Sequence, residues 1–239
     1  MSVAAERRIR RGGIIAAGDG TRLRADGWRS SKPMVAVCGR PLIAHSLERF
    51  RASGIRHLAV IINEQSEDCR QWLASYAGDL ELDLVVKSTP SSYASFRLIA
   101  ERLAGAAAVI TTVDSILPTA SFARFIEGVA ALPADAFVLG LTDHVDDEKP
   151  LWATLDNGDG RIVRLGDPAG GLVTAGLYAL PKHRPVEPAS GFARLRDYLG
   201  WLVSEGHPVY GIVLDRVFDI DRAQDIAAAE LALSGSPSP

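Results

Sequence analysis

The chain has 239 residues, of which 47% are hydrophobic and 23% are charged, ordinary values for a globular protein with a substantial core. Its 26 lysines and arginines against 29 acidic residues give a net charge of −3, which gives no support to nucleic-acid binding. No apolar run reaches the roughly 18 residues of a membrane span, and no hydrophobic signal segment follows the N-terminal arginines. Cys38 and Cys69 have neither zinc nor disulfide spacing. We therefore expect a cytoplasmic protein that contacts no membrane.

The first predicted strand leads into a loop that contains two glycines. The apolar run Ile14–Ala17 precedes Gly18-Asp19-Gly20-Thr21-Arg22-Leu23, and Lys32-Pro33 follows. Glycine permits positive φ and lets backbone N–H groups approach a ligand. Successive N–H groups in one concavity bind anions, to which Arg22 adds bidentate contacts and Lys32 a point charge. The loop is therefore predicted to hold a triphosphate.

The following segments alternate between helix and strand as far as residue 114. The predicted order is a helix over 41–53, a strand over 58–62, a helix over 67–77, a strand over 82–86, a helix over 93–103 and a buried strand over 107–110. Continuous apolar runs rich in β-branched residues are typical of strands covered on both faces. The alternation predicts a parallel sheet with helices on both sides.

The second half has a less regular pattern. Here we expect a helix over 121–131, a strand over 136–142, a hairpin of 152–155 and 161–165, an extended segment over 172–180, a helix over 192–205, a strand over 209–214 and a helix over 222–233. The hairpin is predicted by the turn residues Asn157-Gly158-Asp159-Gly160. Neither a repeat nor a linker divides the chain, so one domain over 1–239 is expected.

Three carboxylates are candidates to bind a metal ion. Asp114 ends a buried strand, and open α/β sheets bind ligands beyond the carboxyl ends of their strands. Asp219 and Asp221 are two residues apart in an extended segment and project to the same side. Mg²⁺ prefers oxygen ligands and commonly neutralises bound phosphates. Asp221 also fits a helix N-cap, with Gln224 in the position that completes a capping box. We keep both Asp219 and Asp221, with a preference for Asp221.

The loop closely resembles the signature of the nucleotidyltransferase superfamily that includes the sugar-1-phosphate nucleotidylyltransferases. The matching string is Ala16-Ala17-Gly18-x-Gly20-Thr21-Arg22-Leu23 with the later Lys32-Pro33, extended by Gly39-Arg40-Pro41-Leu42-Ile43. Ten positions separate Arg22 from Lys32, as in the sugar-phosphate branch, whereas the similar molybdenum-cofactor nucleotidyltransferases place the lysine much closer. A Walker A loop is absent, and Leu23 stands where a dinucleotide-binding loop needs a small residue.

The resemblance implies a fold and a division of labour. The fold would be a three-layer α/β/α sandwich with a mostly parallel central sheet, Rossmann-like and of the GT-A type. Residues 1–115 would form the nucleotide-binding half, 116–233 the acceptor-binding half and 234–239 a disordered tail. The implied site comprises catalytic Arg22 and Lys32; nucleotide-binding Ala16, Ala17, Gly18, Asp19, Gly20, Thr21, Pro90 and Ser92; Asp114 with Asp219 or Asp221 as ligands of Mg²⁺; and Gly176 and Tyr178 on the substrate side.

The implied reaction transfers a nucleoside monophosphate from a nucleoside triphosphate to a sugar 1-phosphate or similar phosphoryl acceptor, with release of pyrophosphate. Lys87 and Ser92 replace the Gln and Gly of the usual base-reading loop, and the segment around Gly166 lacks the lysine that faces the acceptor phosphate in many relatives. Arg164 or Lys182 would have to replace that lysine.

Three alternatives to this reaction remain. They are a molybdenum-cofactor-type nucleotidyltransferase, a GT-A glycosyltransferase and a non-catalytic nucleotide-sensing domain. A glycosyltransferase usually has Asp-x-Asp where Asp114 stands alone. The sequence also leaves a homo-oligomer open.

Overall fold

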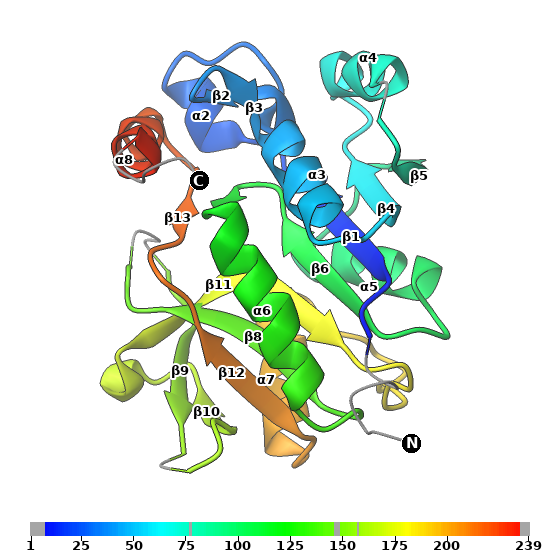
Figure 1. The fold of residues 1–239 in the computed structure, drawn as a ribbon, viewed down its shortest axis with the longest axis vertical. Helices are drawn as coiled ribbons and strands as arrows, with labels where there is room; N and C mark the ends of the chain where they lie inside the picture. The colour runs from blue at the N-terminus through cyan, green and yellow to red at the C-terminus, as the bar shows by residue number, and fades with distance from the viewer. Residues whose placement is uncertain (1–7, 77, 146–148, 157, 235–239) are drawn as a thin grey trace.

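One sheet of nine strands runs through both halves of the chain (Figure 1). The computed structural model describes residues 8–76, 78–145, 149–156 and 158–234. The strands of the sheet are β1 (Arg11–Ala16), β4 (His57–Ile62), β5 (Glu81–Val86), β6 (Ala108–Thr112), β8 (Phe137–Thr142), β9 (Trp152–Leu155), β10 (Ile162–Leu165), β11 (Leu172–Leu180) and β12 (Val209–Val213). Each strand coincides with a segment that the sequence pattern predicts to be extended.

The sheet is mostly parallel. β5, β4, β1 and β6 lie side by side and run in the same direction. β11 pairs antiparallel with β6 and with β8, and β8 pairs parallel with β12. The β9–β10 hairpin attaches to the first residues of β11, where Leu172 and Val173 pair with Ala153 and Trp152. The predicted α/β fold with a mostly parallel central sheet is confirmed.

Helices cover both faces of this sheet (Figure 1). They are α2 (Thr21–Ala25), α3 (Leu42–Ala52), α4 (Glu67–Ser75), α5 (Ser92–Arg102), α6 (Thr119–Ala131), α7 (Leu195–Ser204) and α8 (Ala223–Ser234), with 3₁₀ turns η1 (Lys32–Met34) and η2 (Pro168–Gly170). The core on one face includes residues of α3 and α6, and the core on the other includes residues of α5 and α7. β4 shows the division: Val60 and Ile62 belong to the first core, and Ala59 and Ile61 to the second, because successive strand residues face opposite sides.

Two very short pairs of strands complete the fold. β2 (Ala36–Val37) pairs with β3 (Arg40–Pro41), and β7 (Ser115–Ile116) pairs antiparallel with β13 (Phe218–Asp219). In the second pair, Asp219 lies opposite Ser115, and the N–H of Ile220 donates to the carbonyl of Asp114 at 3.1 Å. This pairing places a C-terminal segment directly at the end of β6.

Some predicted boundaries differ from the structure. α7 begins at Leu195 rather than at residue 192, because Asp197 accepts a hydrogen bond from the backbone N–H of Arg194 at 3.0 Å and so fixes the first turn. Ser234 is the last residue of α8, and the remainder of the predicted tail lies outside the described residues, as does Asn157 of the hairpin turn. Within the described ranges, no helix combines the length and apolar character needed to cross a membrane.

Candidate active site

The loop after β1 has the backbone geometry that its glycines predict. Gly20 has φ 60° and precedes the first residue of α2, Thr21. A Cβ at Gly20 would lie 3.0 Å from the Cβ of Lys32, so both the conformation and the close approach favour glycine. A Cβ at Gly18 would meet no atom within 4 Å. The loop therefore packs against Lys32 on one side and leaves open space at Gly18.

Asn63 holds this loop in place from the end of β4. Its Nδ2 donates to the carbonyl of Ala17 at 3.2 Å and to Oδ1 of Asp19 at 2.9 Å. Its Oδ1 accepts from the N–H of Gln65 at 3.0 Å and from the hydroxyl of Ser88 at 3.2 Å. Our sequence reasoning did not include Asn63. Its only local signal is its position directly after a buried strand, which by itself does not assign a role.

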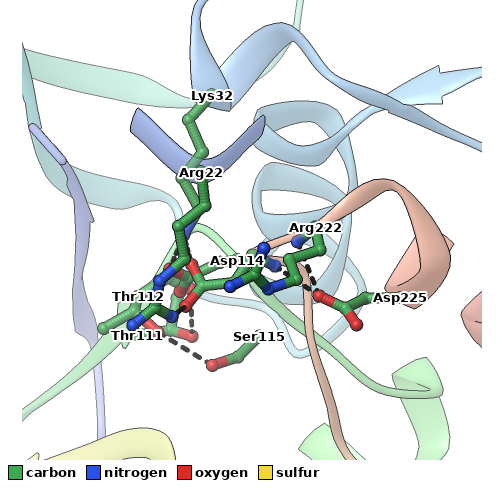
Figure 2. Close-up of polar contacts among 9 residues, drawn as sticks. Arg22, Lys32, Thr111, Thr112, Asp114, Ser115, Arg222 and Asp225 are labelled. Carbon is green, nitrogen blue, oxygen red and sulfur yellow. Dashed lines mark hydrogen bonds and ion pairs between the residues drawn. The ribbon is translucent and has the colours of Figure 1, made fainter. Parts of the chain in front are cut away.

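Two cationic side chains meet carboxylates from distant parts of the chain. Nζ of Lys32 lies 2.5 Å from Oδ2 of Asp114 and 2.5 Å from Oδ1 of Asp221. Nη1 of Arg22 lies 2.6 Å from Oδ2 of Asp221. In Figure 2 the side chains of Arg22 and Lys32 extend toward the same group of polar side chains, which includes Asp114. The structure thus brings together the two predicted catalytic residues and two of the three predicted metal ligands.

The charges in this cluster stabilise one another. Burial by itself would lower the pKa of Lys32, but the carboxylates of Asp114, Asp219 and Asp221 outweigh it and hold that pKa above its ordinary value. Burial would raise the pKa of Asp114, and the Lys32 ammonium reverses the effect, so that this pKa lies below its usual range. At neutral pH Lys32 is therefore cationic and Asp114 anionic.

The three predicted carboxylates are close enough to share a cation. Asp114, Asp219 and Asp221 can each offer one oxygen, and these oxygens lie within 4.8 Å of one another. Hard oxygen donors of this kind suit Mg²⁺. Asp225, not Gln224, closes the first turn near α8, since its Oδ2 accepts from the N–H groups of Asp221 at 2.9 Å and of Arg222 at 2.6 Å. The carboxylate of Asp221 faces Arg22 and Lys32 instead.

A cavity of about 240 Å³, which we call the β11 pocket, adjoins these carboxylates. Asp114 and Asp219 line it together with Gly176 and Tyr178 of β11, the two predicted substrate-side residues. Gly176 has φ 67°, and a Cβ there would collide with the hydroxyls of Ser115 and Thr112, which lie 2.8 Å apart. Glycine at this position therefore keeps that pair of hydroxyls on the pocket wall.

Other predicted residues lie at the edges of the site. Ser92 lines the β11 pocket, and its hydroxyl accepts from the N–H of Leu195 at 3.2 Å, whereas Pro90 is exposed. Arg164 pairs with Asp167 at 2.7 Å and does not line the β11 pocket. A second cavity of about 260 Å³, the loop pocket, is lined by Gly18, Asp19, Lys32 and Asn63 among others. The signature loop is thus next to one cavity, and the carboxylates are next to another.

The chain is similar to known proteins over most of its length. The family model described as MobA-like NTP transferase domain matches residues 12–225. A glucose-1-phosphate thymidylyltransferase of Streptomyces antibioticus is 24% identical over 222 residues, which cover 84% of this chain and 60% of that protein. A mannose-1-phosphate guanyltransferase of Hypocrea jecorina is 32% identical over 97 residues, 40% of this chain and 27% of that protein. The chain therefore spans about a quarter to three fifths of the length of these two relatives.

The fold has close counterparts among solved structures. A putative glucose-1-phosphate thymidylyltransferase from Bacillus anthracis, in complex with a sucrose, superposes with a TM-score of 0.81. The match covers 96% of this chain and 97% of that one at 16% sequence identity. At this identity the likeness concerns the fold.

Proposed function

The chain belongs to the family of MobA-like NTP transferase domains, and we propose that it is a Mg²⁺-dependent nucleotidylyltransferase whose acceptor is a sugar 1-phosphate or a similar phosphate monoester. The observation that carries this proposal is the meeting of Arg22 and Lys32 with Asp114 and Asp221, next to Asp219 and at the edge of the β11 pocket. The ten-residue spacing of Arg22 and Lys32, and the sugar-phosphate substrates in the names of both curated relatives, favour this acceptor over a molybdenum-cofactor precursor.

The proposed reaction needs alignment and charge neutralisation rather than a general base. A phosphate monoester has a second pKa near 6, so at neutral pH the acceptor is already largely an anionic nucleophile. One of its oxygens attacks the α-phosphorus of the nucleoside triphosphate, a P–O bond forms, and the bond to the β-phosphate oxygen breaks. Pyrophosphate leaves with the bonding electrons, and the nucleoside monophosphate stays on the acceptor.

Arg22 and Lys32 supply positive charge where the triphosphate would lie. The open space at Gly18 admits phosphate oxygens close to the loop backbone, and Lys32 also lines the loop pocket. Arginine can hold two phosphate oxygens at once, while lysine follows a moving charge. Asp114, Asp219 and Asp221 would hold Mg²⁺, which when bound offsets the charge of the phosphates. The acceptor would enter the β11 pocket beside Gly176 and Tyr178.

The experiment is a matrix of the common nucleoside triphosphates against several sugar 1-phosphates, with pyrophosphate release as the readout. We expect release that requires both substrates and Mg²⁺ and that is lost in Asp114→Asn. If no combination releases pyrophosphate while triphosphates still bind, the protein is a nucleotide-sensing domain and the proposal is wrong.

A further inference from the structure

The β11 pocket contains a cationic side chain that belongs to neither the signature loop nor the carboxylate cluster. Arg196, the second residue of α7, lines this cavity together with Tyr178, Asp114 and Asp219. Among the described residues of the pocket lining, it is the only arginine or lysine. Arg164 and Lys182, the two cations suggested by the sequence, lie outside that lining. The pocket thus has a positive charge separate from Arg22 and Lys32.

A hydrogen bond to a backbone carbonyl anchors the guanidinium of Arg196 without neutralising its charge. Its Nη2 donates to the carbonyl of Lys149 at 2.6 Å, and the residue is half-buried. In the described part of the chain, no carboxylate forms an ion pair with it. A guanidinium has five N–H donors in a planar fork, so several remain for a ligand. The nearby Arg194 differs, because its side chain is exposed and lies beside Asp197.

Arg196 and Tyr178 line the same cavity, so the charge of Arg196 reaches the Tyr178 hydroxyl. Burial, and then the carboxylates of Asp114 and Asp219, raise the pKa of Tyr178, whereas Arg196 acts on it in the opposite direction. Without a bound cation, the same two carboxylates repel an anionic acceptor that enters the pocket. Arg22 and Lys32 are engaged with Asp221 and Asp114. Whether or not Mg²⁺ is bound, Arg196 is the one arginine or lysine that the described lining offers to an acceptor inside the pocket.

We propose that Arg196 binds an anionic oxygen group of the acceptor and so positions the acceptor against the nucleotide. This inference rests on the proposed function and adds a positioning residue to it. The planar guanidinium suits two oxygens of one phosphate or one carboxylate. The group is either the phosphate that is to be joined to the nucleotide or a second acidic substituent of the sugar, and the two sources can be separated by experiment.

The test is calorimetric titration of the full chain, in the presence of Mg²⁺, with glucose 1-phosphate, glucuronic acid 1-phosphate and pyrophosphate. Arg196→Gln should bind the acceptor roughly 10- to 100-fold more weakly, the scale of a lost charge-assisted hydrogen bond, while pyrophosphate binding stays unchanged. Arg196→Lys should fall in between, because it keeps the charge but loses the fork. Arg194→Gln is the matched control, with the same change of charge outside the pocket. Equal loss for both sugar phosphates identifies the phosphate as the partner, and loss confined to the glucuronic acid compound identifies the carboxylate.

Turnover measurements separate this inference from the proposed function. In the parent protein, pyrophosphate release with any acceptor supports the function whatever Arg196 does. Arg196→Gln should then raise the KM for the acceptor and leave the KM for the triphosphate and the unfolding temperature unchanged, a split that a merely structural residue would not produce. If Arg196→Gln binds both sugar phosphates as tightly as the Arg194→Gln control, or if the parent binds neither, the inference is wrong.

Discussion

Replacement of Lys32 by methionine removes the cation that lies between two carboxylates while it keeps much of the side-chain volume. The Lys32 side chain is 8% exposed, and those of Asp114 and Asp221 are 22% and 30% exposed. Breaking a fully buried ion pair costs about 3–5 kcal/mol, and partial exposure of the carboxylates reduces this, so we expect a loss of about 2 kcal/mol. For a chain of this size that loss lowers the unfolding temperature by roughly 4–8 °C.

The assay is thermal unfolding of the parent and of Lys32→Met, with and without millimolar Mg²⁺. A cation that binds only the folded state stabilises it by mass action. Because the Lys32 ammonium contacts two of the carboxylates that Mg²⁺ would use, Mg²⁺ should stabilise the variant more than the parent. Lys182→Met is the control for the loss of one positive charge, since Lys182 is exposed and a surface change is expected to stay within about 0.5 kcal/mol. Equal unfolding temperatures for Lys32→Met and the parent would show that the cluster does not depend on this lysine.

The pH dependence of stability provides a second readout of the same change. In the parent, the pKa of Asp114 is lower in the folded than in the unfolded chain, so this residue stabilises the fold at pH values above its ordinary pKa of about 3.9. That stabilisation is lost as the pH falls through the lower, folded-state pKa. Without Lys32, burial alone raises that pKa, so the folded variant takes up a proton first. Between about pH 7 and pH 4, Lys32→Met should gain stability relative to the parent. Denaturant midpoints measured across this range would reveal parallel curves if the reasoning is wrong.

Three further changes test the geometry of the site. Gly176→Ala should reduce acceptor use at least tenfold, because φ 67° and the hydroxyl pair leave no room for a Cβ, and an unchanged KM for the acceptor would contradict this. Asp221→Asn should lower turnover on the order of 10²-fold with little loss of stability, since the carboxylate of Asp221 faces Arg22 and Lys32. A Mg²⁺ titration of Asp221→Asn and Asp219→Asn would then show which of the two residues is the second ligand. Cys38 is exposed, whereas burial raises the pKa of Cys69 to about 12. A thiol reagent should therefore modify Cys38 rapidly and Cys69 only after unfolding. Rapid modification of both cysteines would show that Cys69 is accessible.

The elements of the fold were largely predictable because their signals are local. β11 spans Leu172–Leu180, as expected from its apolar extended run, and β4, β5 and β8 lie within one residue of their predicted ends. The order of strands was not predictable in this way. β11 lies between β6 and β8, a position set by pairings across tens of residues, for which no short pattern carries information. Strands of two residues, such as β7 and β13, are also too short for periodicity to show.

The residues of the candidate site also differ in how far the sequence predicts them. The signature loop has a strong local signal, glycines and basic residues after an apolar run. Asp114 has a weaker one, an acid at the end of a buried strand, to which the family resemblance adds. Asn63, Asp225 and Arg196 were missed, because each is defined by a partner or a cavity that folding brings to it. Asn63 reaches Ala17 across 46 positions, and Arg196 reaches Lys149 across 47. A polar residue after a strand or early in a helix is too common to be assigned a role without that partner.

The segment Phe218–Asp221 explains how two distant halves of the chain come to share one site. Its residues alternate, with Phe218 5% exposed and Ile220 fully buried in the core, while Asp219 and Asp221 turn toward Asp114. Because successive side chains of an extended chain point to opposite sides, packing of the two apolar residues into the core places the two carboxylates on the other side. The N–H of Ile220 also donates to the carbonyl of Asp114, so the apolar anchor and the residue at the end of β6 are joined through the backbone. The spacing of the carboxylates therefore depends on core packing of Phe218 and Ile220 rather than on the conformation of exposed loops.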